Sequence, residues 1–185
     1  RTINSLKLAA FDLAEESETH LYAIKTLLRP AIEHFLRFSY LQAQLVKNKN
    51  DCAGEEYRKY CVVSEIIAFV KSHYALVPEK EIQEKVLKNL KKNKGFELSN
   101  RQLEQIVSKW SYKNIARKLD KLLNKDKEKL TFFRELVVQY SELSSFVHGG
   151  MIAETYYHDA FSSRTLENKL REDISLFSFL AATAR

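Results

Sequence analysis

The chain has 185 residues and a net charge of +6, with only four Gly and two Pro among them. This length predicts one domain that is large enough to bury a core. Helix-breaking residues are scarce, and no alternating apolar and polar runs are bounded by turns. The sequence therefore predicts an all-α, single-domain helical bundle over residues 1–185. The first residue is Arg1 rather than Met, which is also expected of a fragment of a longer chain.

Several classes of protein are excluded by composition. No segment has the features of a signal peptide, and charged residues interrupt the apolar runs, so we expect no association with a membrane. Cys52 and Cys61 lack the spacing and the neighbours of a metal site or a disulfide framework. Unpaired thiols indicate a reducing compartment, so we expect a cytoplasmic protein. No His, Glu or Cys constellation supplies several ligands at helical spacing, so neither a metal nor another cofactor is expected.

The expected helices follow one another along the whole chain. Residues 3–47 form one long helix, or two that break near Glu16–Thr19, and Pro30 marks a kink or a helix start. A second long helix covers residues 55–76. The later helices run from Pro78 to Gly95, from a capping box of Ser99 and Gln102 to a corner at Trp110 and Tyr112, over 112–124, over 127–148, and from a cap at Ser162 or Ser163 to Ala182. Apolar stripes predict that helices 20–46 and 128–148 pack together at the centre.

Positive charge is concentrated in residues 85–129, which hold 14 Lys or Arg against 5 Asp or Glu, a net charge of +9. Four cations of this block recur every four residues and share one helix face: Lys113, Arg117, Lys121 and Lys125. Another face carries Ile115, Leu119 and Leu122, which we expect to pack against the bundle. A cationic stripe attracts phosphate backbones without reading sequence, so the four cations are candidate nucleic-acid-binding residues. The alternative is an ordinary solvated lysine face.

The helix that is expected to end near residue 148 carries a polar file. Tyr140, Ser144 and His148 are spaced i, i+4, i+8 and therefore share one face. Gly149 and Gly150 follow at once and stop the helix, because glycine takes the left-handed conformation at little cost. His148 could act there as a ligand, an acid or a base, with Tyr140 and Ser144 lining the approach. The alternative is a terminal histidine that hydrogen-bonds a neighbour and favours the negative end of the helix dipole.

A second polar file lies on the expected helix 20–46, where Arg29, Glu33 and Arg37 are also spaced i, i+4, i+8. Their apolar flanks predict that this ladder is at least partly buried or lies at an interface. We expect Arg29 and Glu33 to point across the bundle toward His148, so that the three residues form a catalytic set. Glu33 would orient the imidazole, and Arg29 would offer a site for an anion or a phosphate. The alternative is a helix-stabilising ion pair.

Three segments add a resemblance to these patterns. They are, in chain order, Leu28-Arg29-Pro30-Ala31-Ile32-Glu33-His34-Phe35, Trp110-Ser111-Tyr112-Lys113-Asn114-Ile115-Ala116 and Tyr140-Ser141-Glu142-Leu143-Ser144-Ser145-Phe146-Val147-His148-Gly149. In this order they resemble an uncharacterised group of bacterial helical proteins related to the HEPN superfamily (higher eukaryotes and prokaryotes nucleotide-binding). The resemblance covers residues 5–180. It implies an all-α bundle, often dimeric, with members in toxin–antitoxin, CRISPR and phage-defence systems.

Many members of that superfamily are metal-independent endoribonucleases. In them an Arg and a His, four to six residues apart on one helix, form a composite active site across a dimer. This sequence departs from that pattern, because Ser141, Glu142 and Leu143 occupy the positions where the Arg is expected. Arg134 lies 14 residues before His148, about 21 Å along a helix axis. Arg29, or Arg134 of a second chain, would have to stabilise the charge on the phosphorane.

Three functions therefore remain open. The first is a HEPN-like effector that binds or cleaves RNA through His148, as in a toxin or a phage-defence system. The second is a non-catalytic HEPN-like module that binds a nucleotide, a nucleic acid or a protein. The third is a structural dimerisation domain. The expected partners are RNA or another nucleic acid, a second copy of the chain, and a partner protein such as an antitoxin.

Overall fold

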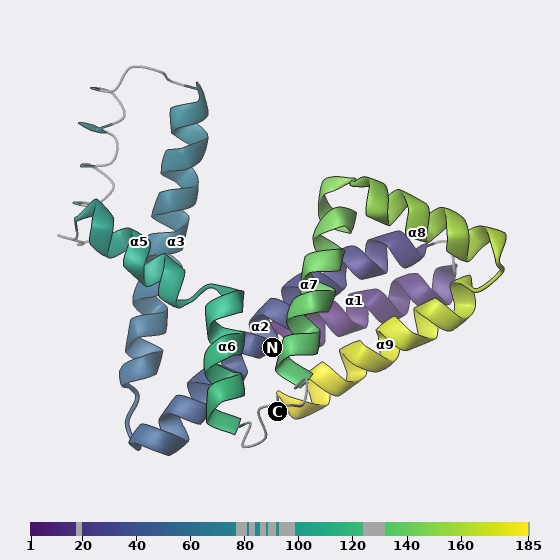
Figure 1. The fold of residues 1–185 in the computed structure, drawn as a ribbon, viewed down its shortest axis with the longest axis horizontal. Coiled ribbons are helices and arrows are strands. Elements are labelled where there is room, and N and C mark those ends of the chain that lie inside the picture. Colours follow the sequence, from purple (N-terminus) through teal and green to yellow (C-terminus); the bar gives the residue numbers. More distant parts are fainter. Residues whose placement is uncertain are drawn as a thin grey trace. The chain divides into compact units, whose positions relative to one another are not determined.

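The computed structural model describes residues 1–17, 20–76, 99–123 and 132–184, together with residues 81, 84, 85, 88 and 92. All regular structure in these residues is helical and none of it is strand, which confirms the expected all-α class. The helices (Figure 1) are α1 Thr2–Glu16, α2 Leu21–Asn48, α3 Cys52–Leu76, α5 Asn100–Lys109, α6 Tyr112–Leu123, α7 Phe132–His148, α8 Met151–Ser162 and α9 Leu166–Thr183. None of these helices combines the length and the apolar character that crossing a membrane requires.

The chain divides into two compact units. Unit 1 contains Arg1–Gln42 and Ile115–Arg185, and unit 2 contains Ala43–Asn114. The helices α2 and α6 are continuous across the two boundaries, so each begins in one unit and ends in the other. The expectation of one domain over residues 1–185 stays a prediction, which a single cooperative unfolding transition would support.

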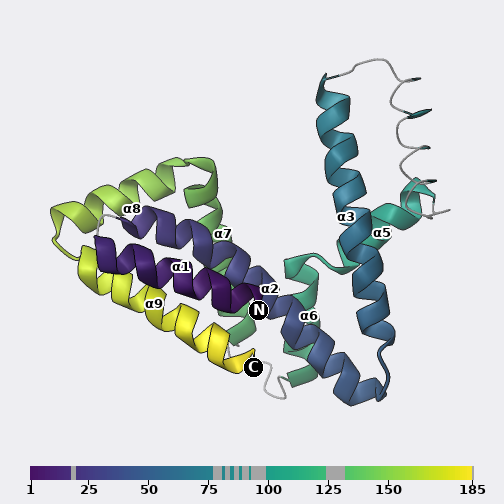
Figure 2. The same ribbon diagram turned by 180° about the vertical axis from the view of Figure 1, so that it is seen from behind.

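Unit 1 is built from helices whose apolar faces meet. Helix α1 lies along α9, α7 leads into α8, and α8 meets α9 at the turn that joins them, as Figures 1 and 2 show. The side chains of α2 and α7 meet through two edge-to-face ring pairs, Tyr22 with Phe146 at 5.3 Å and Phe35 with Phe132 at 6.0 Å between centroids. Such pairs add to the hydrophobic stabilisation of the core. The predicted packing of these two long helices is thereby confirmed.

The start of the chain follows the second of the two expected alternatives, with a break between two helices. Helix α1 ends at Glu16, and Ser17 has extended backbone. Helix α2 then runs from Leu21 to Asn48 with Pro30 inside it, so Pro30 does not start a helix.

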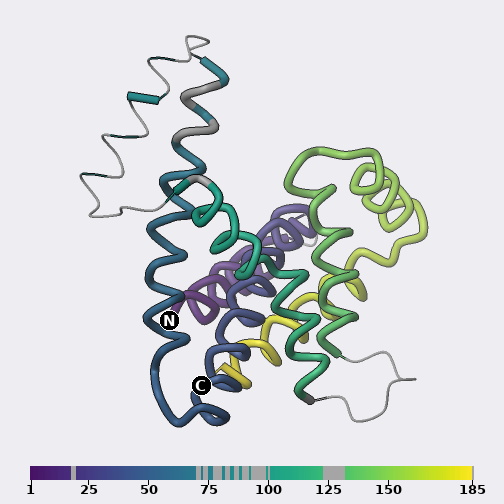
Figure 3. The backbone as a smooth tube through the Cα atoms, turned by 60° about the vertical axis from the view of Figure 1, so that its left-hand side comes forward, coloured from purple at the N-terminus to yellow at the C-terminus, as the bar shows by residue number. Residues whose placement is uncertain are grey.

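Unit 2 contains α3 and α5, which pack against each other (Figure 3). The predicted capping box at the start of α5 is confirmed, because the backbone N–H of Gln102 donates to Ser99 Oγ and the N–H of Ser99 donates back to Gln102 Oε1. Trp110 follows α5 directly and is fully buried against the rings of Tyr57 and Tyr60. The expected helix from Pro78 to Gly95 lies outside the described residues, apart from five helical positions.

The prediction that Ser162 or Ser163 begins the last helix is wrong. Residues 151–162 form a helix of their own, α8, and Ser163 ends it. Its hydroxyl donates back to the carbonyl of Asp159, which satisfies one of the open carbonyls of the last turn. Arg164 then takes a left-handed φ of 54°, and α9 begins at Leu166. A serine hydroxyl can serve either helix end, so the residue type alone does not show which helix it caps.

Candidate functional site

Four charged residues of α2 share one face of the helix within unit 1. Lys25, Arg29, Glu33 and Arg37 follow one another at intervals of four residues, and we call them the α2 file. The sequence predicts the last three as a ladder, and Lys25 extends it by one more turn at the same spacing. Side-chain exposure along the file is low, at 10% for Lys25, 27% for Glu33 and 13% for Arg37. The expected partial burial of the ladder is therefore confirmed.

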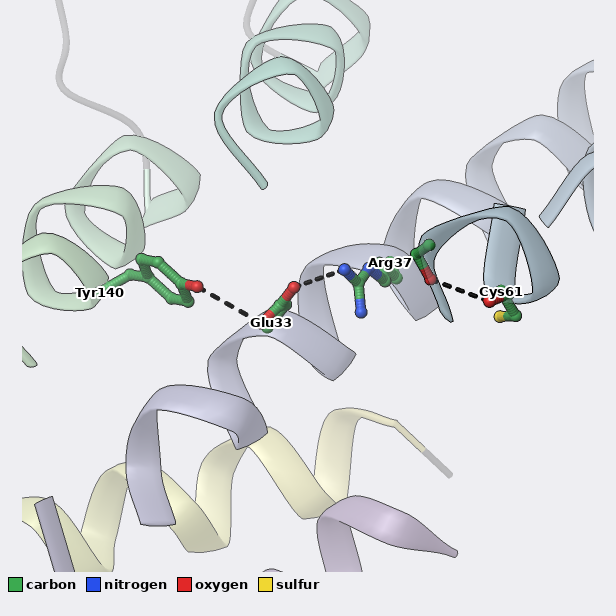
Figure 4. A network of polar contacts seen from close by, with 5 residues as sticks. Glu33, Arg37, Cys61 and Tyr140 are labelled. Carbon is green, nitrogen blue, oxygen red and sulfur yellow. Dashed lines mark hydrogen bonds and ion pairs between the residues drawn. The ribbon is translucent and has the colours of Figure 1, made fainter. Parts of the chain in front are cut away.

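Tyr140 of α7 meets the middle of the α2 file. Its hydroxyl donates to Glu33 Oε2 at 3.3 Å, while Arg37 Nη2 donates to the other oxygen, Oε1, of the same carboxylate (Figure 4). The Arg29 guanidinium lies over the Tyr140 ring, with Cζ 4.8 Å from the ring centroid. This is a cation–π contact, which is strengthened by the burial of the ring. The structure thus brings together three predicted site residues, Arg29, Glu33 and Tyr140.

His148 lies away from this group. It is the last residue of α7 and is exposed, eight residues beyond Tyr140, which corresponds to about 12 Å along the helix axis. Within the described part of the chain its side chain makes no hydrogen bond or ion pair, whereas Glu33 is bonded to Arg37 and Tyr140. These interactions therefore do not bring His148 together with Arg29 and Glu33, the other two residues of the expected catalytic set.

Ser144, the other residue expected to line the approach, is bonded within its own helix. Its hydroxyl donates to the Tyr140 carbonyl at 3.1 Å. The end of the helix follows the prediction, because α7 stops at His148 and Gly149 takes a left-handed φ of 62°. Gly150 then opens α8, where the backbone N–H of Ala153 donates to Ser145 Oγ at 3.0 Å. The glycine pair thus makes the corner between α7 and α8.

Arg134, the other arginine considered for catalysis, is bound to a carboxylate. Its Nε donates to Asp120 Oδ2 at 2.8 Å, and its Nη2 donates to the same oxygen. The Asp120 side chain is only 6% exposed, so the ion pair holds a buried carboxylate between α6 and α7. Arg134 thus helps to neutralise a buried charge, which favours a structural role for this residue.

A buried ion pair at the start of the α2 file was missed by the sequence reasoning. Lys25 Nζ donates to Asp173 Oδ1 of α9 at 3.0 Å, and both side chains are 10% exposed. The same ammonium lies over the rings of Tyr156 and Phe146. Burial raises the pKa of the Asp173 carboxyl, and the charge of Lys25 acts in the opposite direction. No local pattern marks Asp173 as the partner, because 148 residues separate the pair.

His34 lies beside the α2 file in sequence and is half-buried. Burial lowers its pKa, the Arg37 guanidinium lowers it further, and the Glu33 carboxylate raises it. The neutral imidazole is therefore favoured. In the described residues no three His, Cys, Asp or Glu side chains are grouped closely enough to hold a metal ion.

The basic helix α6 has the two faces that its sequence predicts. Lys113, Arg117 and Lys121 are exposed, whereas Ile115 and Leu119 are fully buried. Leu122, expected on the buried face, is 39% exposed in the last turn, so the core covers only the earlier turns. Lys125 lies outside the described residues. We call Lys113, Arg117 and Lys121 the basic face of α6.

The chain matches no family model, no curated protein and no solved structure. The resemblance to the HEPN superfamily therefore rests on the three sequence segments.

Proposed function

We propose that this chain is an RNA-binding helical protein and that the basic face of α6 contacts the phosphate backbone. The observation that carries the proposal is the separation of charge from core on this helix. Cations are exposed on one face, and Ile115 and Leu119 anchor the other face. Exposed cations on a fixed helix can approach phosphates without a loss of packing, and they bind without reading bases.

The acidic residue of α6 does not offset the positive charge of its basic face. Asp120 is the one acidic residue between Tyr112 and Leu123, and its side chain is buried and bound by Arg134. The charge that α6 presents to solvent is therefore positive. The resemblance to HEPN proteins supports RNA as the polymer, since many of those proteins act on RNA.

Replacement of Lys113, Arg117 and Lys121 by Gln tests this proposal. For single strands the logarithm of the affinity falls with the logarithm of the salt concentration, by about 0.7 for each phosphate contact. Loss of three contacts should therefore reduce the slope by about 2 and weaken binding at low salt by on the order of tenfold or more. Fluorescence anisotropy with a labelled single-stranded RNA at several salt concentrations measures both quantities.

The matched control replaces three exposed cations elsewhere, Lys59, Arg164 and Arg171, by Gln. It changes the net charge by the same amount and should retain most of the wild-type affinity and slope. Equal losses in the two triple variants would show that RNA responds only to net charge, which would contradict a binding face on α6. Circular dichroism on all variants verifies the helical fold.

Cleavage by the same chain is the alternative, and the position of His148 favours binding without cleavage. An acid or base that acts on a phosphodiester needs a cation to stabilise the charge of the transition state. In the described residues, no hydrogen bond or ion pair joins His148 to another side chain, and Arg134 is bound by Asp120.

We therefore expect labelled RNA to stay intact on a denaturing gel after incubation with the purified protein. The exposed His148 can be replaced by Ala with little effect on the melting temperature, because its side chain buries little surface. Cleavage by the wild type that disappears in His148→Ala would overturn the non-catalytic assignment and establish the catalytic one.

A further inference from the structure

The α2 file contains one cation whose charge no carboxylate of the described residues balances. Lys25 is paired with Asp173, and Arg37 is paired with Glu33. Arg29 makes no hydrogen bond or ion pair with any described residue, and its guanidinium lies over the Tyr140 ring. Its Nε is buried without a hydrogen-bond partner, although the residue as a whole is half-exposed. The two Nη groups of Arg29 are not among the buried donors, so they are the part of the guanidinium that an external acceptor can reach.

Glu33 is the one acidic residue of α2 and stands a single turn from Arg29. Its carboxylate is held by two other groups, since Arg37 donates to Oε1 and Tyr140 donates to Oε2. The hydroxyl of Tyr140 thus helps to keep the carboxylate engaged, while the ring of the same residue supports the face of the Arg29 guanidinium. The edge of that guanidinium is left for a ligand. The two Nη groups at this edge offer two N–H groups side by side, which match two oxygens of a phosphate.

We propose that Arg29 is the binding residue of a phosphate site on α2, with Tyr140 fixing the plane of the guanidinium and Glu33 restrained by Arg37. The ligand is a phosphate group that accepts two hydrogen bonds from the Arg29 edge. Arg29, Glu33 and Arg37 together carry a net positive charge, which favours an anion. The site uses none of the cations of α6 and does not depend on RNA binding there.

Nuclear magnetic resonance of the arginine Nε–H groups tests the site directly. The Arg29 signal is assigned by its disappearance in Arg29→Lys, and inorganic phosphate is then added to the wild type. We expect a saturable shift of this signal. Isothermal titration calorimetry measures the affinity for phosphate, which should fall by on the order of tenfold or more in Arg29→Lys, because Lys keeps the charge and loses the two-pronged edge. Arg171→Lys is the control, since Arg171 is exposed and already paired with Glu167; it should bind phosphate like the wild type.

A second variant controls for the possibility that a substitution weakens binding by disrupting the fold. Glu33→Gln removes the negative charge next to Arg29 and retains a similar side-chain shape. Affinity for phosphate should rise in this variant, an outcome that misfolding cannot produce. Unchanged or weaker phosphate binding in Glu33→Gln, equal binding in Arg29→Lys and wild type, or the lack of a saturable shift would each overturn the proposal.

Four further ligands test the source and the chemistry of the bound group. Tighter binding of adenosine 5′-monophosphate than of inorganic phosphate indicates a nucleotide, and tighter binding of 5′-phosphorylated RNA than of the same RNA with a 5′-hydroxyl indicates a strand end. Equal binding of acetate and phosphate would overturn the assignment to phosphate. The α6 triple variant should bind inorganic phosphate like the wild type, so the failure of one proposal is distinguishable from the failure of the other.

Discussion

Replacement of Lys25 by Met should lower the free energy of unfolding by about 3–5 kcal/mol at neutral pH. The Lys25 ammonium lies 3.0 Å from Asp173 Oδ1 and 2.9 Å from Oδ2, and each of the two side chains is 10% exposed. Met retains much of the aliphatic stem and removes the charge. The Asp173 carboxylate would then be buried without its ion-pair partner, which is more costly than the loss of an exposed ion pair.

The effect of Lys25→Met should depend on pH in a defined direction. Burial raises the pKa of Asp173 above its reference value of 3.8, and Lys25 and Lys169 oppose this rise whereas Glu172 adds to it. A raised pKa means that the native state holds the proton more tightly, so stability falls as pH rises from about 3.8 through the pKa of the folded state. Without Lys25 that pKa rises further, and the loss of stability with increasing pH becomes larger and extends to higher pH.

Urea unfolding of the wild type and of Lys25→Met at pH 5 and pH 7 measures this difference. The destabilisation should be smaller at pH 5, because a larger fraction of Asp173 is protonated there than at pH 7. Lys25→Met combined with Asp173→Leu should recover stability at both pH values, because an apolar pair of similar volume replaces the buried ions. A loss that is equal at the two pH values would show that packing of the lysine stem, rather than charge, accounts for the destabilisation.

Replacement of Trp110 by Ala should destabilise unit 2 by about 3–5 kcal/mol. Trp110 is fully buried, and its ring lies 5.1 Å from the centroid of Tyr57 and 6.0 Å from that of Tyr60. Ala would leave a cavity between α3 and the end of α5 and would also remove both ring contacts. Trp110→Phe keeps an aromatic ring in the same place and should therefore lose less stability than Trp110→Ala.

Thermal unfolding followed by circular dichroism measures the two losses. Trp110 is the one Trp of the chain, so its fluorescence in the wild type reports on unit 2. Coincident fluorescence and circular dichroism transitions would support the expected single domain, because unit 1 contributes most of the helices. Similar stability of Trp110→Ala and wild type would contradict the role of Trp110 as the centre of unit 2.

The features that were predicted correctly depend on short stretches of sequence. The capping box at Ser99 and Gln102 involves residues three positions apart, and the end of α7 depends on Gly149. The charged and buried faces of α6 follow from helical spacing alone. Ser163 is the instructive exception, because its hydroxyl bonds backwards into α8 instead of forwards into α9. Local rules identify a helix end there without assigning it to one helix.

The interactions of the candidate sites join residues that are far apart in the sequence. Tyr140 and Glu33 are separated by 107 residues, and Lys25 and Asp173 by 148. Helical spacing determined that Arg29, Glu33 and Arg37 share a face, and that Tyr140 and His148 share another. It did not determine where along α7 the α2 file makes contact. The packing of the two helices decided that point, because it aligns Tyr140 with Glu33 and leaves His148 about 12 Å farther along the axis.

The sequence by itself therefore determined the helical class, most helix ends and the positions of charged faces, since these depend on backbone propensity and on a period of 3.6 residues. The tertiary structure decided which of the charged residues are neutralised. Asp173 reaches Lys25, Asp120 reaches Arg134, and Glu33 is bound by Arg37 and Tyr140. The physical reason is that an ion pair forms where core packing brings two helix faces together, and that packing depends on apolar contacts along the whole chain.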